Sequence, residues 1–341
     1  MKVLYLEAPR KASVREFPDP ELKDGHAIVE VELCGVCGTD LGGFKGVSPV
    51  IRYPVVGMGH EAAGRIVEVA PNAKGLRIGD KVCMEPYIGC GACYACRLGR
   101  YNACENLSTC GVHRPGMMAT KFRHPVTHIH KLPERLTWEE GVMVEPLTIG
   151  IHANHRAGVQ AGERVLVVGA GSIGMLAALV SQAYGAVPIL VDPIESRLAL
   201  ARGLGIRHVF NNAAGNLAER LRSVCAGELP HVAIDCSGSG AAVAALATFV
   251  RSAGRVVFVG WPKAECTLDL SWFLKKELDL FGSRNSHGEF PESIDLIAGG
   301  KVEAGKLSMT TVPLAEAPEF LEKLVARPED CLKAIIRVRD D

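Results

Sequence analysis

The sequence predicts a two-domain α/β protein, in which a partly open β-barrel accompanies a doubly wound parallel sheet. Three observations carry this prediction. The first part of the 341-residue chain has short strand signals between Gly- and Pro-rich turns, the central part alternates apolar strands with helical stretches, and the turns return after Gly282. We therefore expect one domain from residues 1–149 and 282–341 and a second from residues 150–281.

Strands in the turn-rich part are predicted from side-chain alternation. Residues 27–32 and 64–70 alternate apolar and polar side chains, as half-buried strands do, and the turn at residues 77–81 follows them. Two amphipathic stretches, residues 291–298 and 315–326, predict helices near the C-terminus. Short strands with frequent turns favour a barrel over a parallel sheet.

The central part carries four compact apolar runs, which predict strands at residues 165–168, 189–191, 232–234 and 255–259. Helical stretches between them, such as residues 196–203, supply the crossovers that parallel strands require.

Composition excludes several classes of function. The formal net charge is +0, so no overall field attracts nucleic acid or an anionic membrane. The longest apolar stretch, residues 165–180, contains three glycines and is too short to span a bilayer, and Glu7 comes too early for a signal peptide. The twelve cysteines suit metal ligation and burial in a reducing compartment better than disulfides. We expect a cytoplasmic protein with no nucleic-acid or membrane partner.

Four cysteines lie together in one Gly-containing loop. Cys90, Cys93, Cys96 and Cys104 have the spacing C-x2-C-x2-C-x7-C, which lets four thiolates converge on one ion. A ferredoxin-type iron–sulfur loop has a shorter last gap followed by Pro, whereas Glu105 follows here. The spacing predicts a structural Zn²⁺. Because four sulfurs close the coordination sphere, the loop is not expected to catalyse.

A G-x-G-x-x-G sequence follows the first apolar strand of the central part and opens a helix. Gly169 permits the tight turn, Gly171 lets the backbone approach a pyrophosphate, and Gly174 lets the helix pack on the strand. This context predicts dinucleotide binding, with Ser172 and Ile173 among the cofactor-binding residues.

Asp192 ends the next predicted strand, where an acid accepts ribose hydroxyls and repels the 2′-phosphate of NADP. We therefore expect NAD. Arg197 is a further cofactor-binding candidate, because its guanidinium could contact a phosphate, although a guanidinium there more often lies on the solvated helix face or pairs locally.

Two more clusters lie in the turn-rich part. Residues 34–40 have the sequence Cys-Gly-Val-Cys-Gly-Thr-Asp, and residues 57–61 have the sequence Gly-Met-Gly-His-Glu. With the glycine motif and the four-cysteine loop, in this order, they resemble the zinc-dependent medium-chain alcohol and polyol dehydrogenases over essentially the whole chain. The resemblance also includes residues 79–82, 144–147 and 282–285. It implies a GroES-like barrel domain that holds zinc and a Rossmann domain that binds NAD.

The resemblance implies a second, catalytic Zn²⁺ in the cleft between the domains, with Cys37 and His60 as ligands. A thiolate and an imidazole suit zinc, and an open position lets a substrate hydroxyl lose its proton near neutral pH. Glu145 matches the third ligand of sorbitol- and threonine-dehydrogenase-like members. Glu61 competes for that place, because in some relatives it binds zinc directly while the later Glu binds the metal's water. The sequence leaves these two roles open.

The resemblance also implies that the Thr39 hydroxyl bonds the reacting oxygen and starts the path by which its proton reaches solvent. The alternative is that Thr39 caps a helix turn. Many relatives end this relay with a His where this chain has Gly42. Ordered water, a carboxylate acting through zinc-bound water, or His113 would then take its place.

Together these features predict an NAD-dependent zinc enzyme that reversibly oxidises a secondary alcohol of a polyol or sugar acid to the ketone. Arg284 and Asn285 are candidate contacts for this small polar substrate, because a guanidinium can clasp a carboxylate. The alternatives are an L-threonine 3-dehydrogenase-like enzyme, suggested by residues 112–116, and a non-catalytic crystallin-like protein that binds dinucleotide. The resemblance further implies a homodimer or homotetramer through the nucleotide domain, helped by the strand at residues 255–259.

Overall fold

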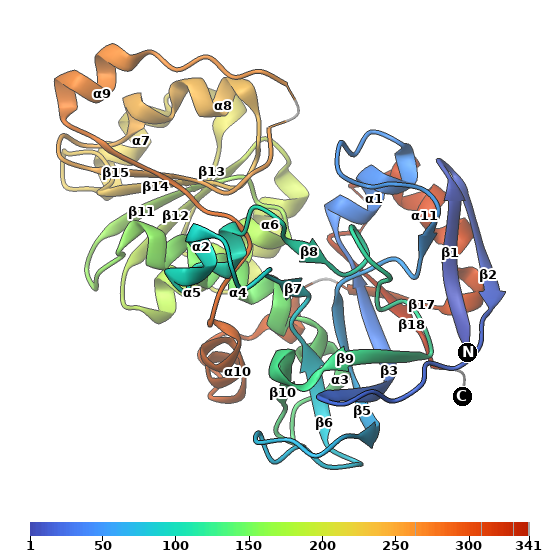
Figure 1. The fold of residues 1–341 in the computed structure, drawn as a ribbon. Helices are drawn as coiled ribbons and strands as arrows, with labels where there is room; N and C mark the ends of the chain where they lie inside the picture. The colour runs from blue at the N-terminus through green and yellow to red at the C-terminus, as the bar shows by residue number, and fades with distance from the viewer. Residues whose placement is uncertain (263, 308, 330, 340–341) are drawn as a thin grey trace. The chain divides into compact units, whose positions relative to one another are not determined.

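The computed structural model describes residues 1–262, 264–307, 309–329 and 331–339. The chain forms two compact units (Figure 1). The first unit comprises Met1–Glu145, Phe290–Ala298 and Ser308–Asp341, and the second comprises Pro146–Glu289 and Gly299–Leu307. Among the described residues, no helix is long and apolar enough to cross a bilayer.

The first unit is built around one long strand, β3 (His26–Val36), in a seven-stranded sheet. One edge of β3 pairs with β5 (Glu61–Val69), and the other is shared by β9 (Lys121–Pro125) and then β18 (Lys333–Arg337). The sheet is completed by β6 (Lys81–Met84), β10 (Ile129–Lys131) and β17 (Met309–Pro313). Two strands thus share one edge of β3 at different heights, in keeping with the predicted partly open barrel.

Smaller elements complete the first unit. A three-stranded sheet contains β1 (Lys2–Ala8), β2 (Lys11–Glu16) and β4 (Val55–Val56), and a short ladder joins β7 (Tyr87–Ile88) to β8 (Ser108–Thr109). The helices are α1 (Gly38–Lys45), α2 (Tyr94–Arg97), α3 (Trp138–Val142), α10 (Phe290–Ala298) and α11 (Ala317–Ala326). The sequence predicted α10 and α11 but missed β17 and β18, whose parallel pairing across α11 is long-range in sequence.

The second unit is a six-stranded, fully parallel sheet with the order β13-β12-β11-β14-β15-β16. The four predicted strands form β11 (Arg164–Val168), β12 (Val187–Asp192), β14 (Val232–Asp235) and β15 (Arg255–Phe258). The sequence missed the outer strands β13 (His208–Asn211) and β16 (Asp279–Gly282). The strand order reverses between β11 and β14, which confirms the predicted doubly wound sheet.

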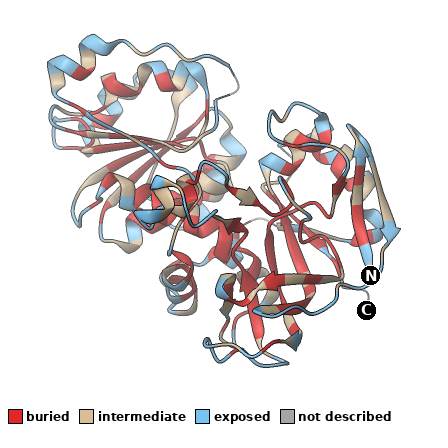
Figure 2. Ribbon diagram, viewed as in Figure 1, coloured by how far each residue is buried: buried red, intermediate tan, exposed pale blue. Residues whose placement is uncertain are grey.

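Helices cover the two faces of this sheet (Figure 1). They are α4 (Val144–Ala157), α5 (Ser172–Ala183), α6 (Glu195–Gly203), α7 (Leu217–Val224), α8 (Gly240–Ala245) and α9 (Leu270–Lys276). Strands β11 and β14 are buried along nearly their whole length, as expected for strands packed on both faces (Figure 2).

One expectation about the sheet needs correction. The strand at residues 255–259 was expected to help subunit contact, but β15 pairs with β14 on one side and β16 on the other. It therefore has no free backbone edge to offer another chain. Among the described residues, the strand with an unpaired edge on this side of the sheet is β16.

Candidate metal centres and nucleotide site

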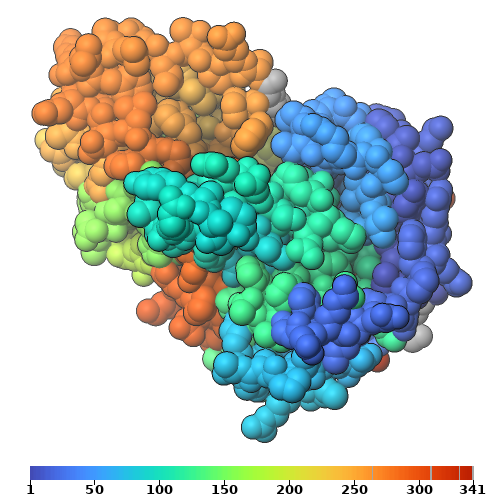
Figure 3. Space-filling view, viewed as in Figure 1, coloured from blue at the N-terminus to red at the C-terminus, as the bar shows by residue number. Residues whose placement is uncertain are grey.

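The four-cysteine loop brings its predicted sulfurs together. The four Sγ atoms all lie within 4.8 Å of one another, and the Sγ atoms of Cys93 and Cys104 are 3.8 Å apart. Tetrahedral zinc with Zn–S bonds of about 2.3 Å requires sulfurs about 3.8 Å apart, so the geometry fits this metal. The loop lies at the surface of the molecule (Figure 3), with Cys90 exposed.

Backbone amides support thiolates in this loop. The N–H of Cys90 donates to Cys104 Sγ at 3.2 Å, and the N–H of Cys93 donates to Cys90 Sγ at 3.4 Å. Amide donors from Ala92 and Cys93 lower the pKa of Cys90 to about 6, whereas desolvation raises the pKa of Cys96 to about 12. Four thiolates cannot lie this close without a cation, because their charges repel one another. The donor set therefore suits a bound Zn²⁺.

A second group of metal-binding atoms forms where β3 and β5 lie side by side. Cys37 follows β3 and is the N-cap of α1, and His60 immediately precedes Glu61, the first residue of β5. One ligand atom from each of these three residues lies within 4.8 Å of the other two. His60 and Glu61 are buried, and Cys37 is half-buried. Thiolate, imidazole and carboxylate are the donors that catalytic zinc takes.

Asp40 holds the two ligand segments together. Its fully buried carboxylate accepts the N–H of Cys37 at 2.8 Å and the N–H of Gly59 at 3.0 Å. His60 Nδ1 is buried without a hydrogen-bond partner, 3.9 Å from Asp40 Oδ1. Metal-binding histidines usually donate their second N–H to such a carboxylate, so the arrangement leaves Nε2 for a metal. Sequence reasoning gave Asp40 no role.

The electrostatics of His60 agree with this arrangement. Burial alone would lower its pKa, but the charges of Asp40 and Cys37 raise it well above the usual range. Burial also raises the pKa of Asp40. A cation is therefore strongly favoured at this position, and a metal ion would supply it.

Glu145 lies at the start of α4 and is buried. Its Oε1 accepts a hydrogen bond from the hydroxyl of Tyr87, and burial raises the pKa of Glu145 to about 7. The charge of Glu145 acts on His60, yet the group of ligand atoms within 4.8 Å contains Glu61 and not Glu145. The geometry thus favours Glu61 as the nearer carboxylate. Tyr87 carried no sequence signal.

Glu61 has a partner that sequence reasoning missed. The Nζ of Lys333, a buried residue at the start of β18, donates to Glu61 Oε2. The available signal was a lysine that opens the apolar run Ala-Ile-Ile, where a charged side chain must be buried or paired.

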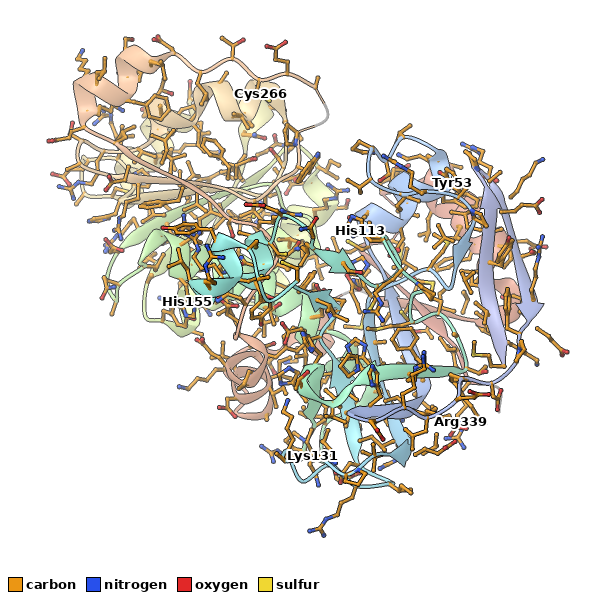
Figure 4. All side chains as sticks on the ribbon, viewed as in Figure 1. Tyr53, His113, Lys131, His155, Cys266 and Arg339 are labelled. Atoms are coloured by element: carbon orange, nitrogen blue, oxygen red, sulfur yellow. The ribbon has the colours of Figure 1, made fainter. Side chains whose placement is uncertain are left out.

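The remaining relay candidates lie on α1 and on a nearby turn. Thr39 is exposed in the first turn of α1, and the N-cap is Cys37, with Asp40 completing the capping box. The cap is therefore not Thr39. His113 is exposed (labelled in Figure 4), and its Nδ1 accepts the N–H of Thr109 at 3.1 Å.

The glycine motif of the second unit has the geometry that a dinucleotide needs. Gly169 has φ 101°, a left-handed conformation that favours glycine. A Cβ on Gly174 would collide with the carbonyl oxygen of Gly169, whereas a Cβ on Gly171, the N-cap of α5, would meet no atom within 4 Å. The turn is thus closely packed at its base and open at the helix N-terminus, where a pyrophosphate binds. Ser172 and Ile173 form the first turn of this helix.

Asp192 ends β12 beside the glycine turn. Its carboxylate accepts the N–H of Ala170 at 2.7 Å and the N–H of Ile194 at 2.8 Å. Each carboxylate oxygen accepts more than one hydrogen bond, so ribose hydroxyls can still bind. Arg197 Nη1 lies 3.8 Å from Asp192 Oδ2. Arg197 therefore pairs locally, which was one of the alternatives to a phosphate contact.

The predicted substrate residues follow β16. Arg284 is exposed, and Asn285 has φ 50°, a left-handed conformation that Asn tolerates well. This segment is fastened to α4: Arg156 donates to the Gly282 carbonyl at 2.9 Å, and the Thr148 hydroxyl donates to Ser286 at 2.8 Å.

Comparison with known proteins agrees with this architecture. Residues 23–134 match the alcohol dehydrogenase GroES-like domain, and residues 172–299 match the zinc-binding dehydrogenase domain. An uncharacterized zinc-type alcohol dehydrogenase-like protein of Haemophilus influenzae is 39% identical over 334 residues, 98% of this chain and 97% of that protein. L-galactonate-5-dehydrogenase of Escherichia coli K12 is 34% identical over 340 residues, 98% of each chain.

A solved structure is similar over the whole chain. An E. coli CFT073 protein described as a short chain alcohol dehydrogenase, crystallised with NADH, has a TM-score of 0.91 at 30% identity and covers 99% of both chains. The chain therefore belongs to the zinc-type medium-chain alcohol and polyol dehydrogenase family, with a GroES-like domain and a Rossmann domain.

Proposed function

We propose that this protein is an NAD-dependent zinc dehydrogenase that reversibly oxidises a secondary alcohol of a polyol or sugar acid to the ketone. The observation that carries the proposal is the group formed by Cys37, His60 and Glu61, which fits a catalytic zinc. The four-cysteine loop fits a second, structural zinc. The relative that acts on L-galactonate supports a polyhydroxy substrate, and the similar structure with NADH supports the cofactor.

In this proposal each residue has a chemical task. When bound, zinc would supply a Lewis acid that makes a hydroxyl easier to deprotonate, and NAD would supply the hydride acceptor. Cys37 and His60 hold the metal, with Glu61 or Glu145 as the third protein ligand. Thr39 accepts the hydrogen bond of the substrate hydroxyl and passes its proton toward solvent. The glycine turn binds the pyrophosphate, with Asp192 holding the adenosine ribose.

Two measurements test this function. Metal analysis should find two zinc ions per chain, and a screen for NAD reduction should find turnover with a polyol or a sugar acid. The screen includes sugar phosphates and 3-hydroxy amino acids, so that a threonine-dehydrogenase-like activity is detected. Iron in place of zinc, or a two-zinc protein that reduces NAD with none of these compounds, would contradict the proposal.

We also propose that Arg284, with Asn285, contacts the polar tail of the substrate. A guanidinium binds a carboxylate through two parallel hydrogen bonds, which an ammonium cannot do. With an acid substrate, Arg284→Lys should lower kcat/KM by about 1–3 kcal/mol of transition-state stabilisation. If Arg284→Lys and Arg284→Ala both keep the wild-type kinetics on the best substrate, the contact does not exist.

Three further expectations belong to the same proposal. The nucleotide-binding domain comprises residues 150–281, and the zinc-binding domain comprises residues 1–149 and 282–341. The protein works in the cytoplasm, where its thiols stay reduced. It assembles as a homodimer or homotetramer, and the free edge of β16 is the surface that supports this assembly.

A further inference from the structure

A buried ammonium group lies beside the candidate catalytic metal centre. Lys333 is only 3% exposed, and its Nζ donates a hydrogen bond to Glu61 Oε2. Burial of an unpaired ammonium is strongly unfavourable, so Lys333 depends on this carboxylate. Yet Glu61 also offers a ligand atom within 4.8 Å of those of Cys37 and His60. The same carboxylate therefore has two cationic partners available, the ammonium and a metal ion.

The fold makes room for the contact between Glu61 and Lys333. Gly35 of β3 pairs with Glu61 of β5 on one side and with Ile335 of β18 on the other. The contact thus crosses the middle strand directly over a glycine. A Cβ on Gly35 would collide with Glu61 Oε2 and would lie 3.1 Å from Lys333 Cε. Any other residue at position 35 would displace the pair, so the backbone is shaped to hold the carboxylate against the ammonium.

Charge explains why an ammonium belongs here. When ionised, Cys37, Glu61 and Glu145 carry three negative charges and Asp40 beside His60 carries a fourth, more than Zn²⁺ alone can balance, and Lys333 supplies a further positive charge. The carboxylates of Glu61 and Glu145 also differ in their hydrogen-bond donors. Glu145 accepts a hydrogen bond from the neutral phenol of Tyr87, whereas Glu61 accepts one from the charged ammonium of Lys333. Charge-assisted hydrogen bonds are roughly twice as strong as neutral ones, so Glu61 is restrained more firmly.

We propose that Lys333 is a positioning residue that keeps Glu61 an exchangeable ligand of the catalytic zinc. The ammonium competes with the metal for the carboxylate, so that Glu61 can yield its place to a substrate hydroxyl. Without Lys333, the metal would be the remaining cationic partner of Glu61, and the carboxylate would leave it less readily. This inference rests on the proposed zinc at Cys37 and His60.

The test measures zinc release to a chelator and the visible absorption of the cobalt-substituted protein. Lys333→Met should slow release of the catalytic zinc by about 10- to 100-fold, the factor that corresponds to the competing charged hydrogen bond, and change the cobalt spectrum toward a higher coordination number. Lys333→Arg keeps the positive charge and should stay close to wild type. Lys81→Met is the matched control, because Lys81 is also buried but donates to the Leu136 carbonyl, and it should leave both readouts unchanged.

A double-mutant cycle shows whether Lys333 acts through Glu61. In a Glu61→Gln background, Lys333→Met should change zinc release little, because the carboxylate is already gone. Gly35→Ala is an independent variant that disturbs the contact between Glu61 and Lys333, because its Cβ would collide with Glu61 Oε2, and it should also slow release. If Lys333→Met does not fold, the zinc release of Gly35→Ala tests the inference instead.

Three outcomes would overturn the inference. Unchanged or faster zinc release in both Lys333→Met and Gly35→Ala contradicts it, and so does an equal effect of Lys333→Met with and without Glu61. If the wild type binds two zinc ions, both of these results contradict the role of Lys333 alone and not the proposed function. A wild-type chain that holds only the zinc of the four-cysteine loop contradicts the proposed function and this inference together.

Discussion

Single residues determine the chemistry of the proposed zinc site. Cys37 contributes the only sulfur of its group, and Asp40 fixes both the Cys37 backbone and the segment before His60. Sulfur is the donor that a borderline-soft metal prefers, and a carboxylate behind an imidazole fixes which ring nitrogen faces the metal. Changes of one functional group should therefore separate metal binding from cofactor binding.

Replacement of Cys37 tests the catalytic metal. Cys37→Ser exchanges a thiolate for a poor ligand, so the protein should keep one zinc per chain and lose at least about 100-fold in kcat. NAD binding, followed by fluorescence titration, should stay unchanged because the glycine turn is untouched. A variant that keeps near wild-type turnover with two zinc ions would rule out this ligand.

Replacement of Asp192 tests the choice of cofactor. Asp192→Ala removes the charge that repels the 2′-phosphate and the acceptor that holds the ribose, so kcat/KM with NAD should fall by roughly 10- to 100-fold relative to NADP. Asp192→Asn is the milder comparison, since its amide oxygen can still accept the Ile194 N–H. A wild-type enzyme that already prefers NADP would contradict the assignment, and Arg197 would become the residue to replace.

At the scale of elements, the four-cysteine loop depends on its metal. Residues 90–104 contain one short α-helix, α2, one turn of 3-10 helix (Tyr101–Ala103) and few buried apolar side chains, so metal binding supplies most of the folding free energy of the loop. Cys93→Ser should remove the structural zinc and lower the midpoint of thermal unfolding by roughly 5 °C or more. Cys266→Ser, at a half-buried cysteine outside both groups, is the control. Unchanged stability and zinc content in Cys93→Ser would reject the closed site.

The buried carboxylate of Glu289, in the segment after β16, contacts two histidines of α4. His152 Nδ1 lies 2.8 Å from Glu289 Oε1, and His155 Nδ1 lies 3.6 Å from the same oxygen. His155, labelled in Figure 4, also stacks on Tyr184, the residue that follows α5. Burial alone would raise the pKa of Glu289, but the histidine hydrogen bonds and charges lower it to about 2.

Because the pKa of Glu289 is lowered in the folded state, we expect the free energy of unfolding to depend on this residue in a pH-dependent way. A carboxylate whose pKa is lower in the folded state stabilises the fold above its ordinary pKa of 4.5, and that stabilisation is lost as the pH falls toward 2. Glu289→Gln should therefore lower the free energy of unfolding by about 1–3 kcal/mol at pH 6 and by much less near pH 2. Urea titrations across this range measure the difference, and an equal loss at both ends would show that the charge is not responsible.

At the scale of the molecule, the sequence predicted what local patterns determine. These patterns involve residues close together in the sequence: the glycine turn, the four central strands and the spacing of the metal-binding residues. Backbone sterics determine the turn, and the distance over which neighbouring side chains can bind one ion determines the spacing. Lys333 reaches Glu61 from a position 272 residues away, and the strand that carries it pairs only in the folded chain. Such contacts depend on tertiary pairing, which periodicity does not report. The outer strands β13 and β16 were missed because neither is a buried apolar run: β13 has one buried residue, and β16 is mostly exposed.

The outermost strand β16 predicts how copies of this chain associate. The edge of β16 is unpaired within the described chain, and Leu280 on it is 40% exposed, while Leu274 of the preceding helix is 84% exposed. Unpaired strand edges and exposed apolar groups both favour association with a second copy. The wild type should elute as a dimer or tetramer, and Leu280→Lys should shift it to a smaller species, because a charge at the edge opposes pairing. Ile78→Lys, at an apolar position in the first unit that is 69% exposed, should leave the assembly unchanged. A wild type that sediments as a monomer, or a Leu280→Lys variant that stays assembled, would exclude this edge as the interface.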